Sequence, residues 1–351
     1  MAMAGKMTRP AGGSRNPFRC GETPLPLELL LAAKVLALVI ILRLVWRGLP
    51  DPFLPFVPFF DYLRHGTYFR LGLKVAVLAA SIALLFNYRV RSACLVIGSA
   101  FLVGILASRL FFENNVMFLG CFFFLLGLYE AKTGPWLLRT QVILLYFAAA
   151  TNKLLDGGWR SGQFFNYWSG IQIKREVYVH AASLIPGMAL PRAMSWITIV
   201  MEFSIALGFC FRRTRVWSIW LGLLLVVGMN FLTERTFGVF FYALPVSYLA
   251  FVVWPRMPII VLYDGDCGFC ARVRRFMERF DVDKQFAWQP FQRAEDLHGI
   301  ARDELRNRLY IIVADKKYSG FAAFKMMALF SPITYFLLLL PLLPLQHGYA
   351  N

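Results

Sequence analysis

Residues 259–270 read IIVLYDGDCGFC and mark the point where the chain changes character. The short run of β-branched and apolar residues over 259–263 predicts a buried strand. Gly265 permits a tight turn, and a helix is expected from about Cys267 to Phe280. A strand, a turn and a helix in this order predict the start of a small α/β domain.

Beyond this stretch, strand and helix patterns continue to alternate. They predict a strand near 285–289, a polar helix near 294–308, a strand over 309–314 and a turn with a return strand over 316–320. A domain of about 75–90 residues is near the lower limit for independent folding. The last residues are strongly apolar and contain Pro341 and Pro344, so we expect a membrane-docked helix, with a ninth span over 333–345 as the alternative.

The preceding part of the chain is far more apolar than a soluble protein. Of all 351 residues, 58% are hydrophobic and 16% charged, against roughly 45–50% and 25% in soluble domains. This composition excludes a disordered chain and predicts an integral membrane protein. Runs long enough to cross a bilayer predict a mostly α, polytopic bundle of about eight spans, near 27–46, 69–87, 92–109, 115–130, 136–155, 193–211, 216–233 and 237–254.

The charge of the chain is strongly basic, with 37 Lys and Arg against 20 Asp and Glu. In a membrane protein this excess fits loops that face anionic lipid, so no nucleic acid is expected as a partner. The distribution of Lys and Arg predicts that both termini lie inside, and we expect a bacterial inner membrane. Three parts follow: a basic cytoplasmic tail (1–26), a helical membrane domain (27–255) and the small domain (256–351).

The two cysteines of the opening stretch are the strongest sign of chemistry. Their spacing places Cys267 and Cys270 on one face of the first helical turn, close enough for a disulfide. Free N–H groups at a helix N-terminus stabilise an anion, which lowers the thiol pKa of Cys267. We therefore expect Cys267 to be the nucleophile and Cys270 the resolving thiol. Asp266 is expected to cap the helix, and Asp264 to accept the proton of Cys270.

Two other interpretations of this cysteine pair stay open. A zinc site would need two more ligands, and the domain offers no second cysteine pair, so no metal is expected. The pair could also be structural, without a redox role. A cysteine pair on a strand–turn–helix favours the redox interpretation.

Residues 261–270 resemble the DCC family of thiol–disulfide oxidoreductases (DUF393), named after its Asp-Cys-Cys arrangement. The resemblance continues through 309–313 to about residue 343. It implies a thioredoxin-like fold for the small domain, and a protein thiol or disulfide as the client.

Charged residues inside the membrane part point to a second site, because they are costly there and usually functional. Lys153 ends one predicted span, and Glu202 lies near the middle of another. We expect these two residues to interact beside a polar cavity. Lys34 and Lys74 lie nearer to span ends, where their side chains can reach the interface.

The sequence around this pair resembles the HTTM family, which includes the membrane domain of the vitamin K-dependent γ-carboxylase. The likeness covers about 27–254 and rests on 137–141, 146–148, 152–154, 158–159, Gly162, Glu202, 212–215, 229–230, Gly238 and 241–242. In the carboxylase, a lysine at the Lys153 position is the base that acts with reduced vitamin K. The resemblance implies Asn152, Lys153, Trp159 and Glu202 as site residues, and a quinone or vitamin K-like lipid as ligand. The family's histidine after paired asparagines is Val116 here, which argues against glutamate carboxylation.

These patterns together predict a membrane-bound thiol–disulfide oxidoreductase, with a lipid quinone as a candidate electron partner. One alternative is a carboxylase-like enzyme that modifies a peptide or lipid at Lys153 and Glu202. Another is a membrane scaffold or maturation factor without catalytic activity.

Overall fold

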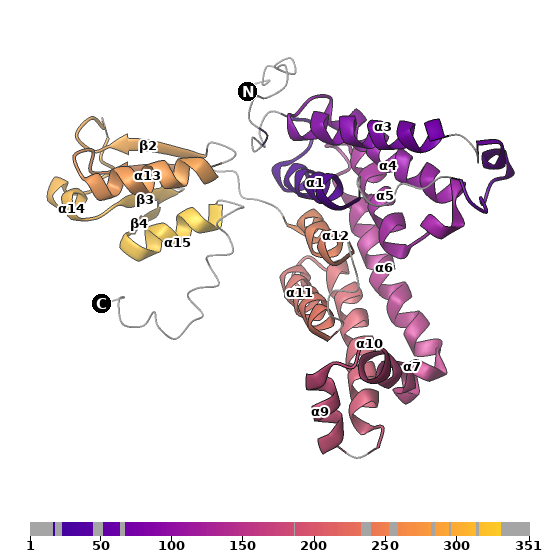
Figure 1. Cartoon of the computed structure of the whole chain (residues 1–351). Coiled ribbons are helices and arrows are strands. Elements are labelled where there is room, and N and C mark those ends of the chain that lie inside the picture. Colours follow the sequence, from indigo (N-terminus) through magenta and orange to yellow (C-terminus); the bar gives the residue numbers. More distant parts are fainter. Residues whose placement is uncertain are drawn as a thin grey trace. The chain divides into compact units, whose positions relative to one another are not determined.

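The protein is mostly helical and divides into two compact units, with the break between Val252 and Val253 (Figure 1). We call them the helical unit and the sheet unit. The computed structural model describes residues 17, 23–44, 52–63, 67–185, 187–232, 240–252, 259–281, 285–294, 296–313 and 316–330.

The helical unit is built from helices joined by short turns. Its α-helices are α1 (Leu27–Val39), α3 (Thr67–Leu85), α4 (Val90–Ala107), α5 (Asn114–Gly127), α6 (Trp136–Leu155), α7 (Gly157–Ser161), α8 (Gln163–Asn166), α9 (Glu176–Leu184), α10 (Ala189–Cys210), α11 (Arg215–Leu232) and α12 (Phe240–Ser247). Short 3-10 and π segments are η1 (Ile40–Leu44), η2 (Pro58–Leu63), η3 (Arg109–Phe111), η4 (Tyr167–Gln172) and η5 (Tyr248–Phe251).

Among the described residues, four helices are long and apolar enough to cross a membrane: Tyr68–Leu85, Val90–Ala107, Ala189–Cys210 and Arg215–Leu232. The other predicted spans differ in length or polarity. Helix α1 has 13 residues and continues directly into the π segment η1, and α5 has 14 residues, against roughly 20 for a typical membrane span. Helix α6 has 20 residues but contains Arg139 and Lys153. The count of about eight spans therefore stays a prediction.

Small residues and buried polar contacts hold the helical unit together. Gly98 lets α4 approach α5, because a Cβ there would lie 2.7 Å from the Cα of Phe124. Lys34 is buried, and its Nζ donates a hydrogen bond of 2.8 Å to the carbonyl oxygen of Leu85. The expectation that the Lys34 side chain reaches the interface is therefore wrong: the ammonium group lies at the C-terminus of α3, where the helix dipole favours a cation.

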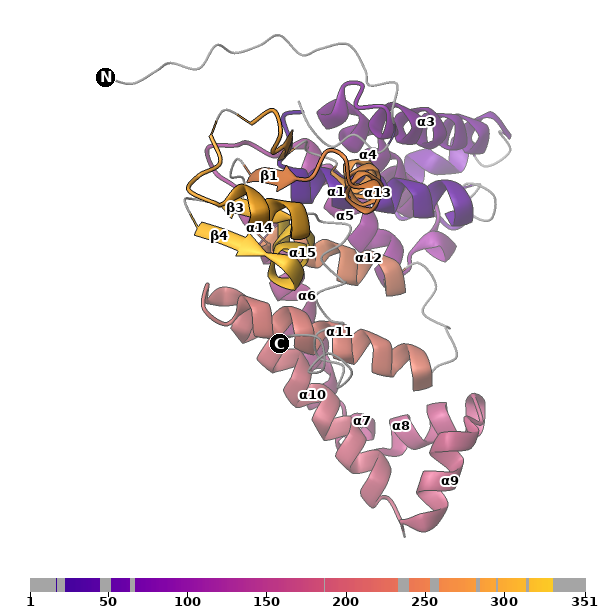
Figure 2. The same cartoon turned by 90° about the vertical axis from the view of Figure 1, so that its left-hand side faces the viewer.

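The sheet unit contains four strands in the order β2-β1-β3-β4. Strand β1 pairs parallel with β2 and antiparallel with β3, and β3 pairs antiparallel with β4. Figure 1 labels β2, and Figure 2 labels β1, β3 and β4. The elements in chain order are β1 (Ile259–Tyr263), α13 (Gly268–Phe280), β2 (Phe286–Pro290), α14 (Arg302–Asn307), β3 (Tyr310–Val313), β4 (Lys316–Ser319) and α15 (Gly320–Phe330).

Alternating side chains of the strands build two apolar layers, one on each face of the sheet. On one face, Val261 and Ile311 pack with Met277 of α13 and Met327 of α15. The opposite face packs Leu262, Ile312 and Ile300 with Leu305 of α14. The unit is thus a three-layer α/β/α arrangement, with α13 and α15 on the same face.

Most predicted elements of this unit are confirmed within about one or two residues. The polar helix expected over 294–308 is wrong, since only Arg302–Asn307 is helical in the described residues of that segment. His298 and Gly299 have φ angles of 52° and 68°, which turn the chain before the helix begins. The helix or ninth span expected over 333–345 lies outside the described residues.

Candidate active site

Cys267 is the residue that begins α13, at the end of the loop that follows β1. It is the N-cap residue, with φ −81° and ψ 113°, and its Sγ accepts a hydrogen bond of 3.4 Å from the backbone N–H of Cys270. The expectation that Asp266 caps the helix is wrong, because the sulfur of Cys267 occupies this position instead. A thiolate here would receive the hydrogen bond that the helix terminus offers.

The two thiols lie in different surroundings, although both are partly exposed. Cys270 packs with Val273 against the core cluster that contains Met277. Hydrogen bonds from Cys270, first from its backbone N–H and then from its side chain, lower the pKa of Cys267. Burial, followed by the interaction with Cys267, raises the pKa of Cys270 to about 11. Cys267 is therefore the thiol that ionises first.

Gln292 fixes the loop between β1 and α13, a role that the sequence did not indicate. Its Nε2 donates hydrogen bonds to Asp264 Oδ1 at 2.6 Å and to Asp266 Oδ2 at 3.3 Å. Its Oε1 accepts a hydrogen bond of 3.0 Å from the backbone N–H of Gly265. One side chain thus contacts three consecutive residues of the loop that precedes Cys267.

The two aspartates of the loop are held by this contact. Asp264 Oδ1 also accepts a hydrogen bond of 3.0 Å from the backbone N–H of Asp266. The charge of Asp264 raises the pKa of both cysteines, as the smallest of the contributions to each. The parallel pairing of β1 with β2 explains this contact: carboxyl ends of parallel strands lie at one edge of a sheet, and Gln292 follows β2 as Asp264 follows β1.

Arg274 attaches α13 to β1 and differs from the other arginines of the helix. Its Nη1 donates a hydrogen bond of 2.6 Å to the Tyr263 hydroxyl, and its Nε lies 2.7 Å from Glu278 Oε1. Arg272, Arg275 and Arg279 are exposed. Among the described residues, no group of three or more His, Cys, Asp or Glu could hold a metal ion.

The model of the DCC1-like thiol-disulfide oxidoreductase family matches residues 261–350. This region contains the sheet unit from within β1 onwards, with both cysteines and Gln292, and it supports a thiol–disulfide redox role for that unit. No curated protein and no solved structure matches the chain.

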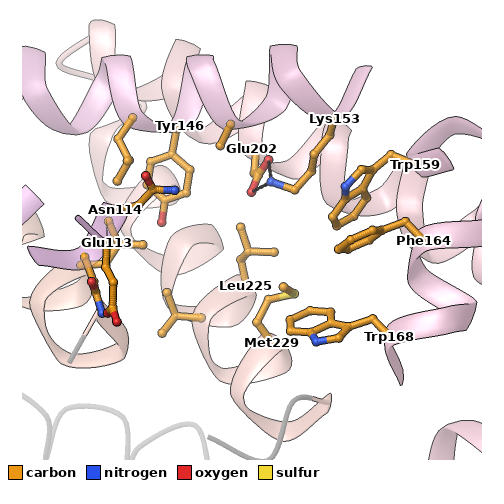
Figure 3. Close-up of a pocket in the computed structure, with 15 residues that line it drawn as sticks. Glu113, Asn114, Tyr146, Lys153, Trp159, Phe164, Trp168, Glu202, Leu225 and Met229 are labelled. Atoms are coloured by element: carbon orange, nitrogen blue, oxygen red, sulfur yellow. Dashed lines mark hydrogen bonds and ion pairs between the residues drawn. The ribbon is translucent and has the colours of Figure 1, made fainter. Parts of the chain in front are cut away.

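The helical unit contains the ion pair that the sequence predicts. Lys153 lies near the end of α6 and Glu202 within α10, and the two helices pack together. Lys153 Nζ is 2.8 Å from both carboxylate oxygens of Glu202 (Figure 3). The side chains are 17% and 10% exposed. Each charge therefore depends on the other, because a buried charge without a partner is costly.

A short turn places Trp159 beside this pair. Asp156 caps α7 through Oδ1, which accepts hydrogen bonds from the backbone N–H groups of Gly158 and Trp159 at 2.6 and 3.4 Å. The Trp159 ring centroid lies 5.1 Å from Lys153 Nζ and 4.7 Å from the Phe164 ring, on which it stacks. The lysine thus contacts a carboxylate and an aromatic face together.

The ion pair faces a cavity of about 640 Å³ within the helical unit, a size typical of small-molecule sites. Figure 3 shows Trp159, Phe164 and Trp168 at one end, and Glu113 and Asn114 at the other. The remaining lining residues are Asn115, Leu145, Tyr146, Ala149, Lys153, Glu202, Leu225, Val226, Met229 and Leu244.

The predicted residues of this site divide into two groups. Lys153, Glu202 and Trp159 line the cavity, whereas the Asn152 side chain is exposed and does not. Tyr146, whose hydroxyl is hydrogen-bonded to that of Tyr248, lines it as well. Sequence reasoning missed Glu113, Phe164 and Trp168, because it gave no role to the segments that carry them.

Proposed function

We propose that the protein is a membrane-bound thiol–disulfide oxidoreductase in which Cys267 is the nucleophile and Cys270 the resolving thiol. The observation that carries the proposal is the hydrogen bond from the Cys270 N–H to Cys267 Sγ. It favours ionisation of the more accessible thiol, while burial keeps Cys270 protonated. The match of residues 261–350 to DCC1-like thiol-disulfide oxidoreductases supports this assignment.

The exchange proceeds in two steps. The Cys267 thiolate attacks one sulfur of a client disulfide, forms a mixed disulfide and releases the first client sulfur as a thiolate, which takes a proton from water. Cys270 then loses its proton and attacks Cys267 Sγ, which releases the second client thiolate. The client gains two electrons, and the cysteine pair becomes a disulfide. A second dithiol or a quinol returns the pair to its reduced form with two electrons and two protons.

Asp264 is the group that we propose accepts the proton of Cys270 in the second step. It interacts with Cys270 through both its backbone and its charge. Gln292 and the N–H of Asp266 hold its carboxylate in place. Asp266 has no hydrogen bond to either cysteine among the described contacts, so we assign it to the loop structure.

The connectivity of the sheet unit supports a thioredoxin-like fold. The order β1-α13-β2-α14-β3-β4-α15 combines a parallel first pair of strands with an antiparallel hairpin. The nucleophile lies at the start of the helix that follows the first strand. This placement gives Cys267 the hydrogen-bonding N-terminus that thiolate chemistry requires.

The four candidate spans support a membrane location. A bacterial inner membrane with both termini inside is part of the proposal. In that orientation Cys267 faces a reducing cytosol, so the pair would reduce its client. A protein thiol or disulfide and anionic lipids are the partners that we propose.

A second candidate function concerns the cavity of the helical unit, which we propose binds a planar lipid such as a quinone. Its aromatic end can stack on a flat ring, and Lys153 can donate a hydrogen bond to a carbonyl oxygen. Tyr146, Lys153, Trp159, Glu202 and Met229, five residues of the HTTM-like pattern, line this one cavity. The contact with Glu202 favours a lysine that is a charged donor over one that is a base.

Titration of the full-length protein with a short-chain benzoquinone tests the cavity. Trp159→Leu should weaken binding roughly 3- to 10-fold, because it removes the aromatic face. Trp196→Leu is the matched control, since Trp196 is 40% exposed and does not line the cavity. Equal affinities of the two variants would remove the cavity from the proposal.

Trapping of the mixed disulfide tests the redox function. Cys270→Ser lacks the resolving thiol, so the full-length variant should accumulate a reductant-sensitive adduct at Cys267 in cells. The double variant Cys267→Ser/Cys270→Ser should accumulate none, and Cys94→Ser, which alters a buried cysteine of α4, should behave like the unmodified protein. Absence of any Cys267 adduct would favour the scaffold interpretation instead.

A further inference from the structure

The outward side of α13 combines exposed aromatic rings with arginines. Phe269, Arg272, Phe276 and Arg279 follow a helical spacing that places them on one stripe. Phe269 is 59% and Phe276 is 51% exposed, and both arginines are exposed, as is Arg275 beside them. We call these five residues the α13 face.

The α13 face lies opposite the side of the helix that packs on the sheet. Cys270, Val273 and Met277 belong to that inward side. Large exposed apolar side chains are informative when they gather on one surface. Phe269 and Phe276 are exposed on one surface and do not belong to the hydrophobic core of the sheet unit.

The positive charge of this face is not offset within its own helix. The one acidic residue of α13 is Glu278, and it pairs with Arg274, whose guanidinium also contacts Tyr263. Arg272, Arg275 and Arg279 therefore contribute three positive charges. Helix α15, on the same face of the sheet, has no acidic residue and adds the exposed Phe321 and Lys325.

We propose that the α13 face rests on the surface of an anionic bilayer. Exposed phenylalanine rings can enter the boundary between head groups and acyl chains, while the long side chains of neighbouring arginines reach the lipid phosphates. Anionic lipid complements the charges of Arg272, Arg275 and Arg279, which no described acidic residue of α13 offsets. The sheet unit belongs to the same chain as the helical unit, which contains the candidate spans.

Docking of α13 on the bilayer would determine where thiol–disulfide exchange takes place, which the proposed redox function does not specify. Cys267 begins the same helix, so a docked α13 holds the nucleophile at the membrane surface. Clients whose disulfides lie close to the bilayer are then reached more readily than clients in free solution.

Photo-cross-linking of the full-length protein in nanodiscs tests the proposal. A photo-reactive phenylalanine analogue replaces Phe276 in bilayers of phosphatidylcholine with or without phosphatidylglycerol, and cross-linked lipid is detected by mass spectrometry. Each arginine near an anionic surface changes partitioning on the order of 5-fold. Arg272→Gln/Arg275→Gln/Arg279→Gln should therefore reduce lipid cross-links in anionic discs by at least 10-fold.

The matched control removes the same charge from the opposite side of the sheet unit. Arg302→Gln/Arg306→Gln/Arg308→Gln alters three exposed arginines in and after α14 and should leave the cross-links unchanged. The analogue placed at Ala301, an exposed residue beside α14, should give few lipid cross-links. Cross-links from position 276 to protein rather than lipid, or equal lipid cross-links in both bilayers, would overturn the proposal.

Reduction of a small soluble disulfide separates this inference from the redox function. The triple glutamine variant of α13 should retain this activity, since the altered residues do not contact either cysteine in the described contacts. If the triple variant loses its lipid cross-links but still reduces the soluble disulfide, the three arginines act in membrane docking and not in thiol exchange.

Discussion

Gln292 Nε2 lies 2.6 Å from Asp264 Oδ1 and so ties the end of β2 to the loop that precedes the nucleophile. The two residues are 28 positions apart in the sequence. The parallel pairing of β1 with β2 brings them to one edge of the sheet. Local chemistry at Cys267 therefore depends on a contact that only the folded domain provides.

Replacement of Gln292 by glutamate should make Cys267 less reactive. A carboxylate cannot donate to Asp264, and a further negative charge raises the pKa of the nearby thiol. We expect alkylation of Cys267 at pH 7 to slow by roughly 3- to 10-fold. Ala301→Glu adds the same charge at an exposed position of the sheet unit and should leave the rate unchanged. Equal rates for both variants would show that Gln292 does not position the loop.

The pH dependence of alkylation should differ between the two cysteines. Labelling of Cys267 should rise through a pKa below that of an ordinary thiol, whereas labelling of Cys270 should rise only near pH 11. The lowered pKa of Cys267 stabilises the folded reduced protein above the unfolded thiol's pKa, and this contribution is lost as the pH falls through the lowered pKa. Mass spectrometry of pulse-alkylated protein separates the two sites. A shared midpoint would contradict the assignment of nucleophile and resolving thiol.

Glu202→Gln should destabilise the helical unit, because it leaves the Lys153 ammonium buried without its counter-charge. Breaking such a pair costs roughly 3–5 kcal/mol. Glu113→Gln is the control, since Glu113 lines the same cavity but is exposed. Thermal unfolding of the purified variants compares the two. Unchanged folding and activity in Glu202→Gln would mean that the ion pair has no role.

Gly98→Ala should separate α4 from α5, since the added Cβ would lie 2.8 Å from the carbonyl oxygen of Gly120. Overpacking of this kind costs roughly 1–3 kcal/mol. Gly72→Ala places the same methyl group in α3, where nothing lies within 4 Å of it, and should be neutral or slightly stabilising. The midpoints of thermal unfolding of the two variants are measured in the same detergent. A lower midpoint for Gly98→Ala alone indicates a specific clash between α4 and α5, whereas equal midpoints indicate only the general effect of alanine on helix propensity.

The sequence predicted features with a local cause and missed those that arise from pairing. Strand β1 and helix α13 follow from periodicity, and the contact of Lys153 with Glu202 follows from the cost of unpaired charges in apolar helices. The N-cap was misassigned, because Asp266 and Cys267 are adjacent and only backbone angles show which residue begins the helix. Gln292 was missed for another reason: strand order and direction decide its neighbours.

Hydrophobicity alone does not predict the lengths of the helices in the helical unit or the residues that line its cavity. It predicted spans at α1 and α5, whose α-helical parts have 13 and 14 residues, so these two spans stay predictions. Trp159 could be selected from its pattern, whereas Phe164 and Trp168 join it because α7, α8 and η4 fold around one cavity. Such residues are found from the structure, since the way in which three short segments fold, and not one helical period, brings all three rings to the cavity.

Redox titration of the full-length protein shows whether Cys267 and Cys270 form a reversible disulfide. The protein is equilibrated in thiol–disulfide buffers of graded potential, and the redox state of Cys267 and Cys270 is read by alkylation and mass spectrometry. We expect one reversible two-electron transition that involves both cysteines together and disappears in Cys267→Ser. The absence of a reversible disulfide between them at any potential would contradict an oxidoreductase.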